Sequence, residues 1–164
     1  MASLISHAVA ALGIGTVSMV PDLDVIGFRF GIRYGDFWGH RGFTHSLLFA
    51  AILATLVTTI GFFQGSPGLS RISLFLYFFL ATASHGLLDA MTNGGLGVAF
   101  FSPFDNTRYF LPWRPIVVSP ISVTRFFSER GLAVLQGELL WIWIPTGLLA
   151  VLMLVLRRTL LKQN

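Results

Sequence analysis

The chain has 164 residues, which suits one domain over residues 1–164. Hydrophobic residues make up 54% of it and charged residues only 11%, against about 25% in soluble domains, and this composition excludes an ordinary soluble protein. The formal net charge of +4 comes from scattered Lys and Arg residues without a basic run among aromatics, which excludes a nucleic-acid partner and favours a membrane surface.

Four apolar segments predict helices that meet a membrane, and together they predict an all-α integral membrane helical bundle. The segments are residues 2–20, 46–63, 72–88 and 139–156. Each approaches the ~20 residues that a helix needs to cross a hydrocarbon core of ~30 Å. The first is the weakest, because it contains His7 and several Gly and Ser residues and ends at Pro21. It is a tilted span, a re-entrant helix or a helix buried against the others.

The connections between these segments differ in character. Residues 21–44 form a polar loop that carries acidic and histidine residues. Residues 64–71 form a short turn, so the second and third segments make an antiparallel hairpin. Residues 90–138 make a long connection rich in Phe, Trp and Pro, which predicts an ordered segment on the membrane interface with a helix over residues 123–135.

Histidines and aspartates gather where three of these segments meet one side of the membrane. His40 and His45 precede the second segment, and Thr44 between them is expected to cap its helix. His85 and Asp89 are four residues apart and therefore point from one face of the third helix near its end. With the aspartates that follow the first segment, the candidate ligands on this side are Asp22, Asp24, His40, His45, His85 and Asp89.

These side chains predict a divalent metal site. The chain has no Cys, so imidazole and carboxylate groups must hold any metal, and together they suit zinc, manganese or iron. We expect zinc first, as one or two ions; two-metal hydrolytic sites use the same mixture of groups. Each motif alone has a simpler explanation, since a single His often hydrogen-bonds a neighbouring helix and a Pro-Asp pair often only caps a helix. Ionisable groups at membrane depth jointly favour a functional site.

His7 is a further candidate ligand in an unfavourable position. In a straight helix that rises 1.5 Å per residue, His7 would lie roughly 22 Å from Asp22, too far to share a metal. Either the first helix is broken or steeply packed at its Gly and Ser residues, or His7 is not a ligand.

Three arginines are candidate substrate-binding residues, because a guanidinium can bind a phosphate bidentately. Arg41 lies within the histidine motif, whereas Arg108 and Arg114 lie among aromatic residues, where they suit membrane anchoring equally well. Arg41 is also a catalytic candidate for charge stabilisation. Whichever of Asp22 and Asp24 is not fully coordinated is expected to orient a catalytic water.

The motifs together resemble those of the YdjM-like family of bacterial inner-membrane proteins, which are described as metal-dependent hydrolases. The resemblance is carried by His7, Pro21-Asp22-Leu23-Asp24, the run from His40 to Ser46, His85-Gly86-Leu87-Leu88-Asp89 and Ser102-Pro103-Phe104. It implies a multi-pass protein of the bacterial inner membrane with metal ligands among these His and Asp residues. More remotely, their order is similar to that in zinc-dependent phospholipase C and P1 nuclease, although this chain lacks the later His and Glu ligands expected there.

The resulting hypothesis is hydrolysis of a phosphoester bond in a lipid or lipid-linked substrate at the bilayer surface. Two alternatives stay open: a metal-ion or proton transporter, and a structural or regulatory membrane protein that binds metal only for stability. The uncharged residues 46–63 offer no midplane ion path, which argues against the transporter.

The basic residues that follow the last segment, Arg157, Arg158 and Lys162, favour a cytoplasmic C-terminus. This orientation puts the metal site on the extracytoplasmic face, although seven arginines on the metal side argue the reverse. The sequence predicts no oligomeric state.

Overall fold

The computed structural model describes residues 16–62, 68–121 and 126–161. Within these ranges the chain is helical and forms no strand, although isolated bridges join Thr92 to Ile116 and Val98 to Tyr109. The all-α prediction is therefore confirmed. Two compact units form, Met1–Met91 with Gly95–Pro112 and Thr92–Gly94 with Trp113–Asn164, and each is described by itself. The single domain over residues 1–164 stays a prediction.

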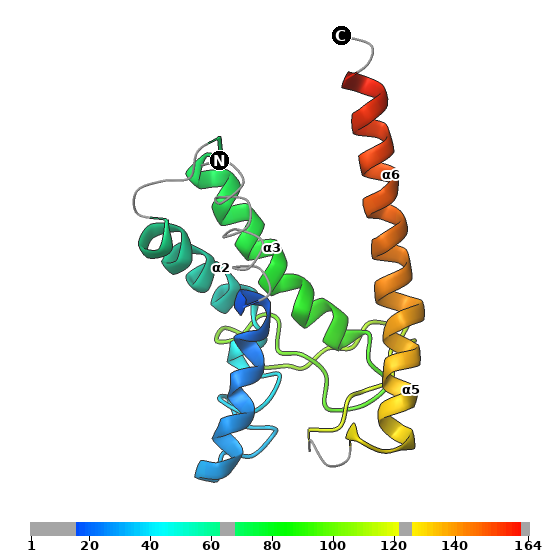
Figure 1. The fold of residues 1–164 in the computed structure, drawn as a ribbon. Helices are drawn as coiled ribbons and strands as arrows, with labels where there is room; N and C mark the ends of the chain where they lie inside the picture. Colours follow the sequence, from blue (N-terminus) through cyan, green and yellow to red (C-terminus); the bar gives the residue numbers. More distant parts are fainter. Residues whose placement is uncertain (1–15, 63–67, 122–125, 162–164) are drawn as a thin grey trace. The chain divides into compact units, whose positions relative to one another are not determined.

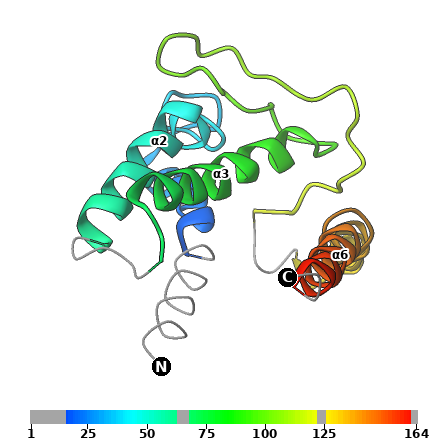
Figure 2. The same ribbon diagram turned by 90° about the horizontal axis from the view of Figure 1, so that it is seen from above.

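The first unit contains a helical hairpin preceded by short helices. Its elements are the 3₁₀ helices η1 (Pro21–Phe30) and η2 (Phe43–His45), the α-helix α2 (Leu47–Leu56), the π-helical η3 (Val57–Gly61) and the α-helix α3 (Arg71–Ala90). α2 and α3 lie side by side and run in opposite directions, as predicted (Figures 1 and 2). The predicted loop over residues 21–44 is wrong for its first part, because Pro21 at the start of η1 fixes a helical φ and Gly31 ends the helix at a φ of 81°.

α3 packs through a single stripe of residues. It buries every fourth residue, namely Leu74, Phe78, Thr82, Gly86 and Ala90. Because residues four apart share one helix face, this spacing leaves the rest of α3 half-buried or exposed. Val17 and Ala54 pack with Leu74 and Phe78 to form the buried core. Toward the end of α3, the small residue Gly86 lets the backbone of His45 approach closely.

The hairpin differs from the prediction in the length of its first arm. α3 has 20 residues and is long and apolar enough to cross a membrane, in agreement with the predicted segment 72–88. α2 has ten residues and η3 has five. At 1.5 Å per residue the two make about 22 Å of helix, which is shorter than the ~30 Å hydrocarbon core of a bilayer. The predicted cap at Thr44 is also wrong: Ser46 caps α2, and its hydroxyl oxygen accepts from the Phe49 N–H at 3.0 Å. Most of the predicted segment 2–20 lies outside the described residues, and Thr16–Met19 are helical.

The segment between α3 and the second unit is ordered against the first unit, without strands. Val98 and Tyr109 exchange backbone hydrogen bonds of 2.9 Å, and the Ala99 N–H donates to the Arg41 carbonyl at 3.1 Å. The Leu111 N–H donates to the Ala90 carbonyl at 2.9 Å. This part of the long connection is therefore fixed beside the histidine motif.

The second unit is dominated by one continuous helical run. α5 (Glu129–Glu138), the π-helical η4 (Leu139–Trp143) and α6 (Ile144–Leu161) follow one another without a break. Glu129–Leu160 is the second helix in the described residues that is long and apolar enough to cross a membrane. The predicted helix over residues 123–135 is confirmed for Glu129–Leu135, and in the structure it continues without a break into the apolar run. Pro145 is accommodated directly after the π-helical turn.

Candidate metal centre

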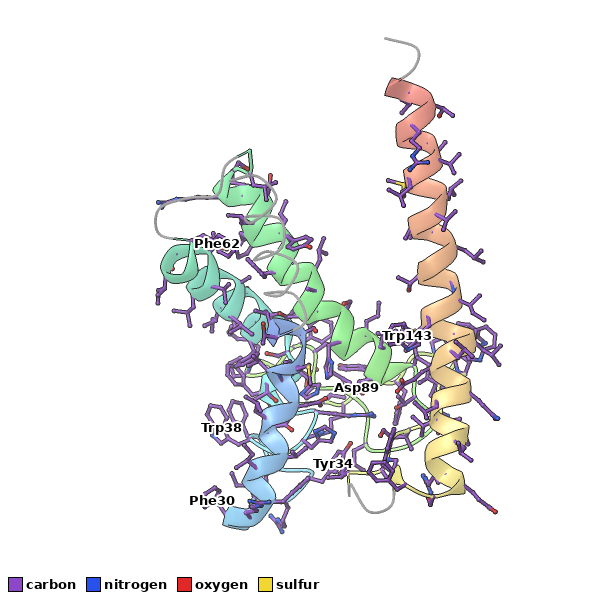
Figure 3. The ribbon with its side chains drawn as sticks, viewed as in Figure 1. Phe30, Tyr34, Trp38, Phe62, Asp89 and Trp143 are labelled. Atoms are coloured by element: carbon purple, nitrogen blue, oxygen red, sulfur yellow. The ribbon has the colours of Figure 1, made fainter. Side chains whose placement is uncertain are left out.

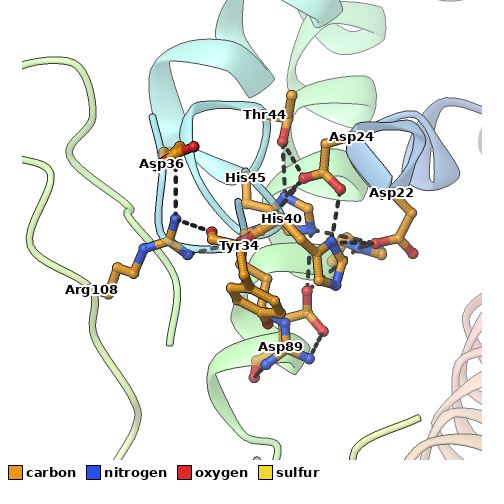
Figure 4. A network of polar contacts seen from close by, with 11 residues as sticks. Asp22, Asp24, Tyr34, Asp36, His40, Thr44, His45, Asp89 and Arg108 are labelled. Carbon is orange, nitrogen blue, oxygen red and sulfur yellow. Dashed lines mark hydrogen bonds and ion pairs between the residues drawn. The ribbon is translucent and has the colours of Figure 1, made fainter. Parts of the chain in front are cut away.

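Three segments far apart in the sequence bring four candidate ligands together in the first unit (Figure 4). Asp22 lies in the first turn of η1, and His45 ends η2. His85 and Asp89 lie one turn apart near the end of α3. Gly86 allows this approach, because a Cβ there would lie only 3.0 Å from the backbone oxygen of His45.

The four distances between imidazole nitrogens and carboxylate oxygens are close to those of a tetrahedral metal site. Nε2 of His45 lies 3.5 Å from Oδ1 of Asp22 and 3.2 Å from Oδ2 of Asp89. Nε2 of His85 lies 3.3 and 3.7 Å from the same two oxygens. Zinc with ligands at about 2.0–2.1 Å separates neighbouring ligands by about 3.3–3.4 Å in a regular tetrahedron. The spacing of this set therefore fits one such ion.

Two of these ligand atoms are buried and lack a hydrogen bond. Nε2 of His45 and Nε2 of His85 have no hydrogen-bond partner within the described part of the chain. A buried polar atom is normally hydrogen-bonded, because leaving it without a partner costs free energy. A cation between these nitrogens and the carboxylate oxygens would satisfy both kinds of group. The chemistry of the set agrees with its spacing.

Asp24 lies behind His45 instead of joining the ligand set. Its Oδ1 lies 2.7 Å from Nδ1 of His40, and its Oδ2 accepts from the Thr44 hydroxyl at 2.7 Å and the Arg41 N–H at 3.2 Å. Because the Thr44 hydroxyl donates to Asp24, its oxygen is left to accept from Nδ1 of His45, 3.1 Å away. This arrangement keeps a proton on Nδ1 of His45 and directs Nε2 toward the ligand set, as carboxylates do for metal-binding histidines.

Arg41 is tied to Asp89 and to the backbone. Its Nη2 lies 2.7 Å from Oδ1 of Asp89, its Nη1 donates to the Asp89 carbonyl at 3.3 Å, and the residue is buried. The backbone of Arg41 has a φ of 63°, which residues other than glycine rarely adopt. The bond to Asp24 and the bond from the Ala99 N–H hold it there. With Oδ1 of Asp89 held by Arg41, Oδ2 faces the two imidazoles.

The carboxylates and imidazoles shift one another's ionisation. Burial acts to raise the pKa of Asp22 and of Asp24, but the histidines beside them outweigh burial. The pKa of Asp22 lies well below its ordinary range, and the pKa of Asp24 falls to about 2. Burial acts to lower the pKa of His45, but Asp22, Asp24 and Asp89 outweigh it and raise this pKa from 6.5 to about 10. In the absence of a metal, His45 is therefore a cation at neutral pH, and a metal has to displace a proton from it.

Arg108 braces the loop that carries His40. Its guanidinium donates to the backbone oxygens of His40, Tyr34 and Asp36 at 2.8, 3.0 and 3.2 Å and lies 5.8 Å from the centroid of the Tyr34 ring (Figure 4). Arg114 belongs to the second unit. A part for either arginine in substrate binding stays a prediction.

The structure brings together most of the residues singled out from the sequence and divides them into two groups. Asp22, His45, His85 and Asp89 form the four-ligand set, whereas Asp24 and His40 form a second group that shares His45. His7 lies outside the described residues. The sequence interpretation missed the contacts of Thr44 with Asp24 and His45. The place of Thr44 between the two histidines was the available signal, but it was interpreted as a helix cap.

Comparisons with known proteins agree on one family. The sequence model described as YdjM inner membrane protein matches residues 2–162. The curated "Inner membrane protein YbcI" of Escherichia coli (strain K12) is 40% identical over 175 residues, which cover 96% of this chain and 99% of that protein. No solved structure matches the chain.

Proposed function

The chain belongs to the YdjM inner membrane protein family, and from this premise we propose that it is a membrane-bound metal-dependent hydrolase. One divalent ion, with zinc the best fit, is held by Asp22, His45, His85 and Asp89. The reaction is the cleavage of a phosphoester bond in a lipid or lipid-linked substrate. The remote likeness to zinc-dependent phospholipase C and P1 nuclease remains part of this proposal.

One observation carries the metal site. Nε2 of His45 and Nε2 of His85, buried and without hydrogen bonds, lie 3.2–3.7 Å from the same two carboxylate oxygens. Histidinium–carboxylate pairs alone would be expected to form at least one well-aligned hydrogen bond between these atoms. A tetrahedral ion explains the spacing and the missing hydrogen bonds together.

Each surrounding residue has a defined task in this proposal. When bound, the metal would supply a water with a pKa of about 7 and polarise the phosphoryl oxygen. Asp24 and Thr44 keep His45 in the tautomer that presents Nε2. Arg41 holds one oxygen of Asp89 and so presents the other. In this proposal Arg41 acts through Asp89, and a contact of its guanidinium with the substrate stays a prediction.

His40 is the proton acceptor in the proposed reaction. Its Nδ1 lies 2.7 Å from Asp24, so its other ring nitrogen remains to take a proton. The ring centroids of His40 and His45 are 5.4 Å apart, which places His40 beside the ligand set. Asp24 itself is unsuited to orienting a water, because its side chain is buried and both of its oxygens have partners. The aspartate–histidine pair replaces it in this task.

A lipid substrate follows from where the site opens. The side chain of Asp22 is 49% exposed, whereas the other ligands are largely buried, so a substrate approaches at Asp22. α3 and Glu129–Leu160 are the spans that support a multi-pass arrangement. The ligands lie at the end of α3, where lipid headgroups are expected. From the basic residues that follow the apolar segment 139–156, we propose that this face is extracytoplasmic.

Metal content and hydrolysis, measured together, test the proposal. The full chain is purified in detergent, its metal is determined by mass spectrometry, and phosphate-ester products are assayed from phosphatidylglycerol vesicles before and after chelation. We expect about one equivalent of zinc, with activity that chelation removes and zinc restores. Asp22→Asn should lose both properties, and Asp36→Asn, which changes an exposed aspartate paired with Arg33, is the matched control. Less than one equivalent of metal together with full activity after chelation would overturn the proposal.

A further inference from the structure

η1 carries an exposed apolar edge on the helix that also supplies Asp22. In a 3₁₀ helix, with three residues per turn, residues three apart lie on one edge. Leu23 and Ile26 have this spacing and are 59% and 50% exposed, and Arg29 continues the same edge. Phe30, at the end of the helix, is 79% exposed. Large apolar side chains are therefore displayed along the whole length of η1.

The other side of η1 is already occupied. Phe28 faces the rings of Tyr34 and His40, with centroids 6.3 and 6.5 Å away. Figure 3 shows Phe30 and Trp38 on one flank of η1 and Tyr34 on the other. Trp38 is 55% exposed, although its ring also contacts Phe37 and Phe43. Leu23, Ile26, Phe30 and Trp38 therefore leave an exposed apolar surface on η1 and the loop that follows it.

We propose that this surface, the η1 edge of Leu23, Ile26, Phe30 and Trp38, lies in the headgroup–acyl boundary of an anionic bilayer. Membership of an inner membrane protein family places a bilayer within reach of the chain. A tryptophan beside aliphatic and phenyl side chains is typical of that boundary.

Charge complementarity selects lipid as the occupant. Arg29 lies on the edge itself. The side chain of Arg33, just beyond Gly31, is 87% exposed, and it also pairs with Asp36 at 3.2 Å. Basic residues next to an apolar edge are attracted to anionic headgroups while the apolar groups enter the acyl region.

The η1 edge would set the depth of Asp22, which lies on the same helix next to Leu23. A metal at Asp22 would then face the headgroup region, where a phosphoester is found. That consequence rests on the proposed function, whereas the location of the edge does not.

The absence of Cys from the chain makes a direct test possible. Single cysteines are introduced in the full chain by Leu23→Cys, Ile26→Cys and Phe30→Cys, labelled with a nitroxide and reconstituted in phosphatidylglycerol vesicles. Relaxation of each label by oxygen, which concentrates in lipid, is compared with relaxation by a water-soluble nickel chelate. The same nitroxide free in buffer is the aqueous control.

We expect oxygen to dominate at all three edge positions, with an oxygen-to-nickel ratio several-fold above that of the control. Nickel dominance would put the edge in water, and low access to both reagents would mean that a protein surface covers it; either result overturns the inference. Replacing phosphatidylglycerol by phosphatidylcholine should lower the ratio at Phe30→Cys, and an unchanged ratio would overturn the part assigned to the arginines. Zinc content measured on the same labelled proteins separates these results from a failure of the proposed hydrolase.

Discussion

The two units of the chain differ in the side chains that they bury and expose. The first unit buries a network of ionisable side chains, including His40, Arg41 and His45, between η1, η2 and α3. In the second unit, α6 exposes apolar residues such as Leu148 and Met153 along its length. The stability of the first unit therefore depends on the pairing of its buried charges. The stability of the second depends on an apolar environment around its exposed side chains.

This difference shows where a change should be felt. Buried charges are tolerated only when they are paired, so removing one member of the network leaves another without compensation. An outward apolar side chain on a lipid-facing helix has no such dependence. Substitutions within the buried network of the first unit should therefore alter metal binding and chemistry, and substitutions in the second unit should leave both intact.

The largest effect should come from His45→Ala, which removes the histidine shared by the four-ligand set and the Asp24 group. Bound zinc should fall from about one equivalent to near zero and hydrolysis should disappear with it, because one of four ligands is lost. Mass spectrometry of the purified protein measures the metal. A second-unit control, Leu148→Ala, should retain full occupancy, and equal losses in both variants would break the contrast between the units.

His40→Gln should separate binding from chemistry. If His40 is the proton acceptor held by Asp24, the variant should keep its zinc and lose about 10²–10⁴ in turnover. The change should appear in kcat. Loss of zinc in this variant would instead make His40 a ligand, as the sequence interpretation had it.

The hairpin and the shared face of the site could be predicted from the sequence, and the tasks of individual residues could not. The lengths of the apolar segments and the short turn between the second and third segments predicted that His45, His85 and Asp89 lie on one side of the membrane. The division between Asp22 and Asp24 depends on η1: two residues apart in a 3₁₀ helix point about 120° apart, but residues 21–44 were expected to be a loop.

The contact of Arg41 with Asp89 could not be predicted from the sequence, for a different reason. It depends on a backbone φ of 63°, which no local sequence signal indicates for an arginine. An arginine inside a histidine motif was therefore taken as a substrate ligand. Its partner Asp89, which lies 48 residues along the chain, is known only from the fold.

Arg41→Lys should weaken zinc binding by about 10–100-fold, the usual cost of losing a partner that orients a ligand. Lysine keeps the charge but cannot hold both Oδ1 and the carbonyl of Asp89 in one plane. Competition with a metal-binding dye gives the affinity. Arg108→Lys, which changes an arginine bonded to backbone oxygens, is the matched control and should bind zinc normally. An unchanged affinity in Arg41→Lys together with a raised KM would return Arg41 to substrate binding.

Raising the pH should destabilise the metal-free protein and spare the zinc-loaded one. The pKa of His45 is about 10 in the metal-free fold against 6.5 ordinarily, so its charged form stabilises the fold fully below pH 6.5. That contribution is lost as the pH rises toward 10. Zinc replaces the proton, so the loaded protein should lack this loss and bind zinc more tightly over the same range. Melting temperatures of both forms in detergent check the sign, and His45→Ala should flatten the metal-free curve.

The smallest effect should come from the second unit, where aromatic contact takes the place of charge pairing. The Trp113 and Trp141 rings meet edge to face with centroids 4.9 Å apart, an arrangement that contributes about 0.5–1.5 kcal/mol beyond its buried area. Trp113→Leu should therefore speed proteolysis of the segment before α5 without changing zinc content. Trp143→Leu, at a more exposed tryptophan of the helical run that carries Trp141, is the control and should have little effect. If Trp113→Leu instead released zinc, the metal site would depend on the second unit, and the contrast between the two units would fail.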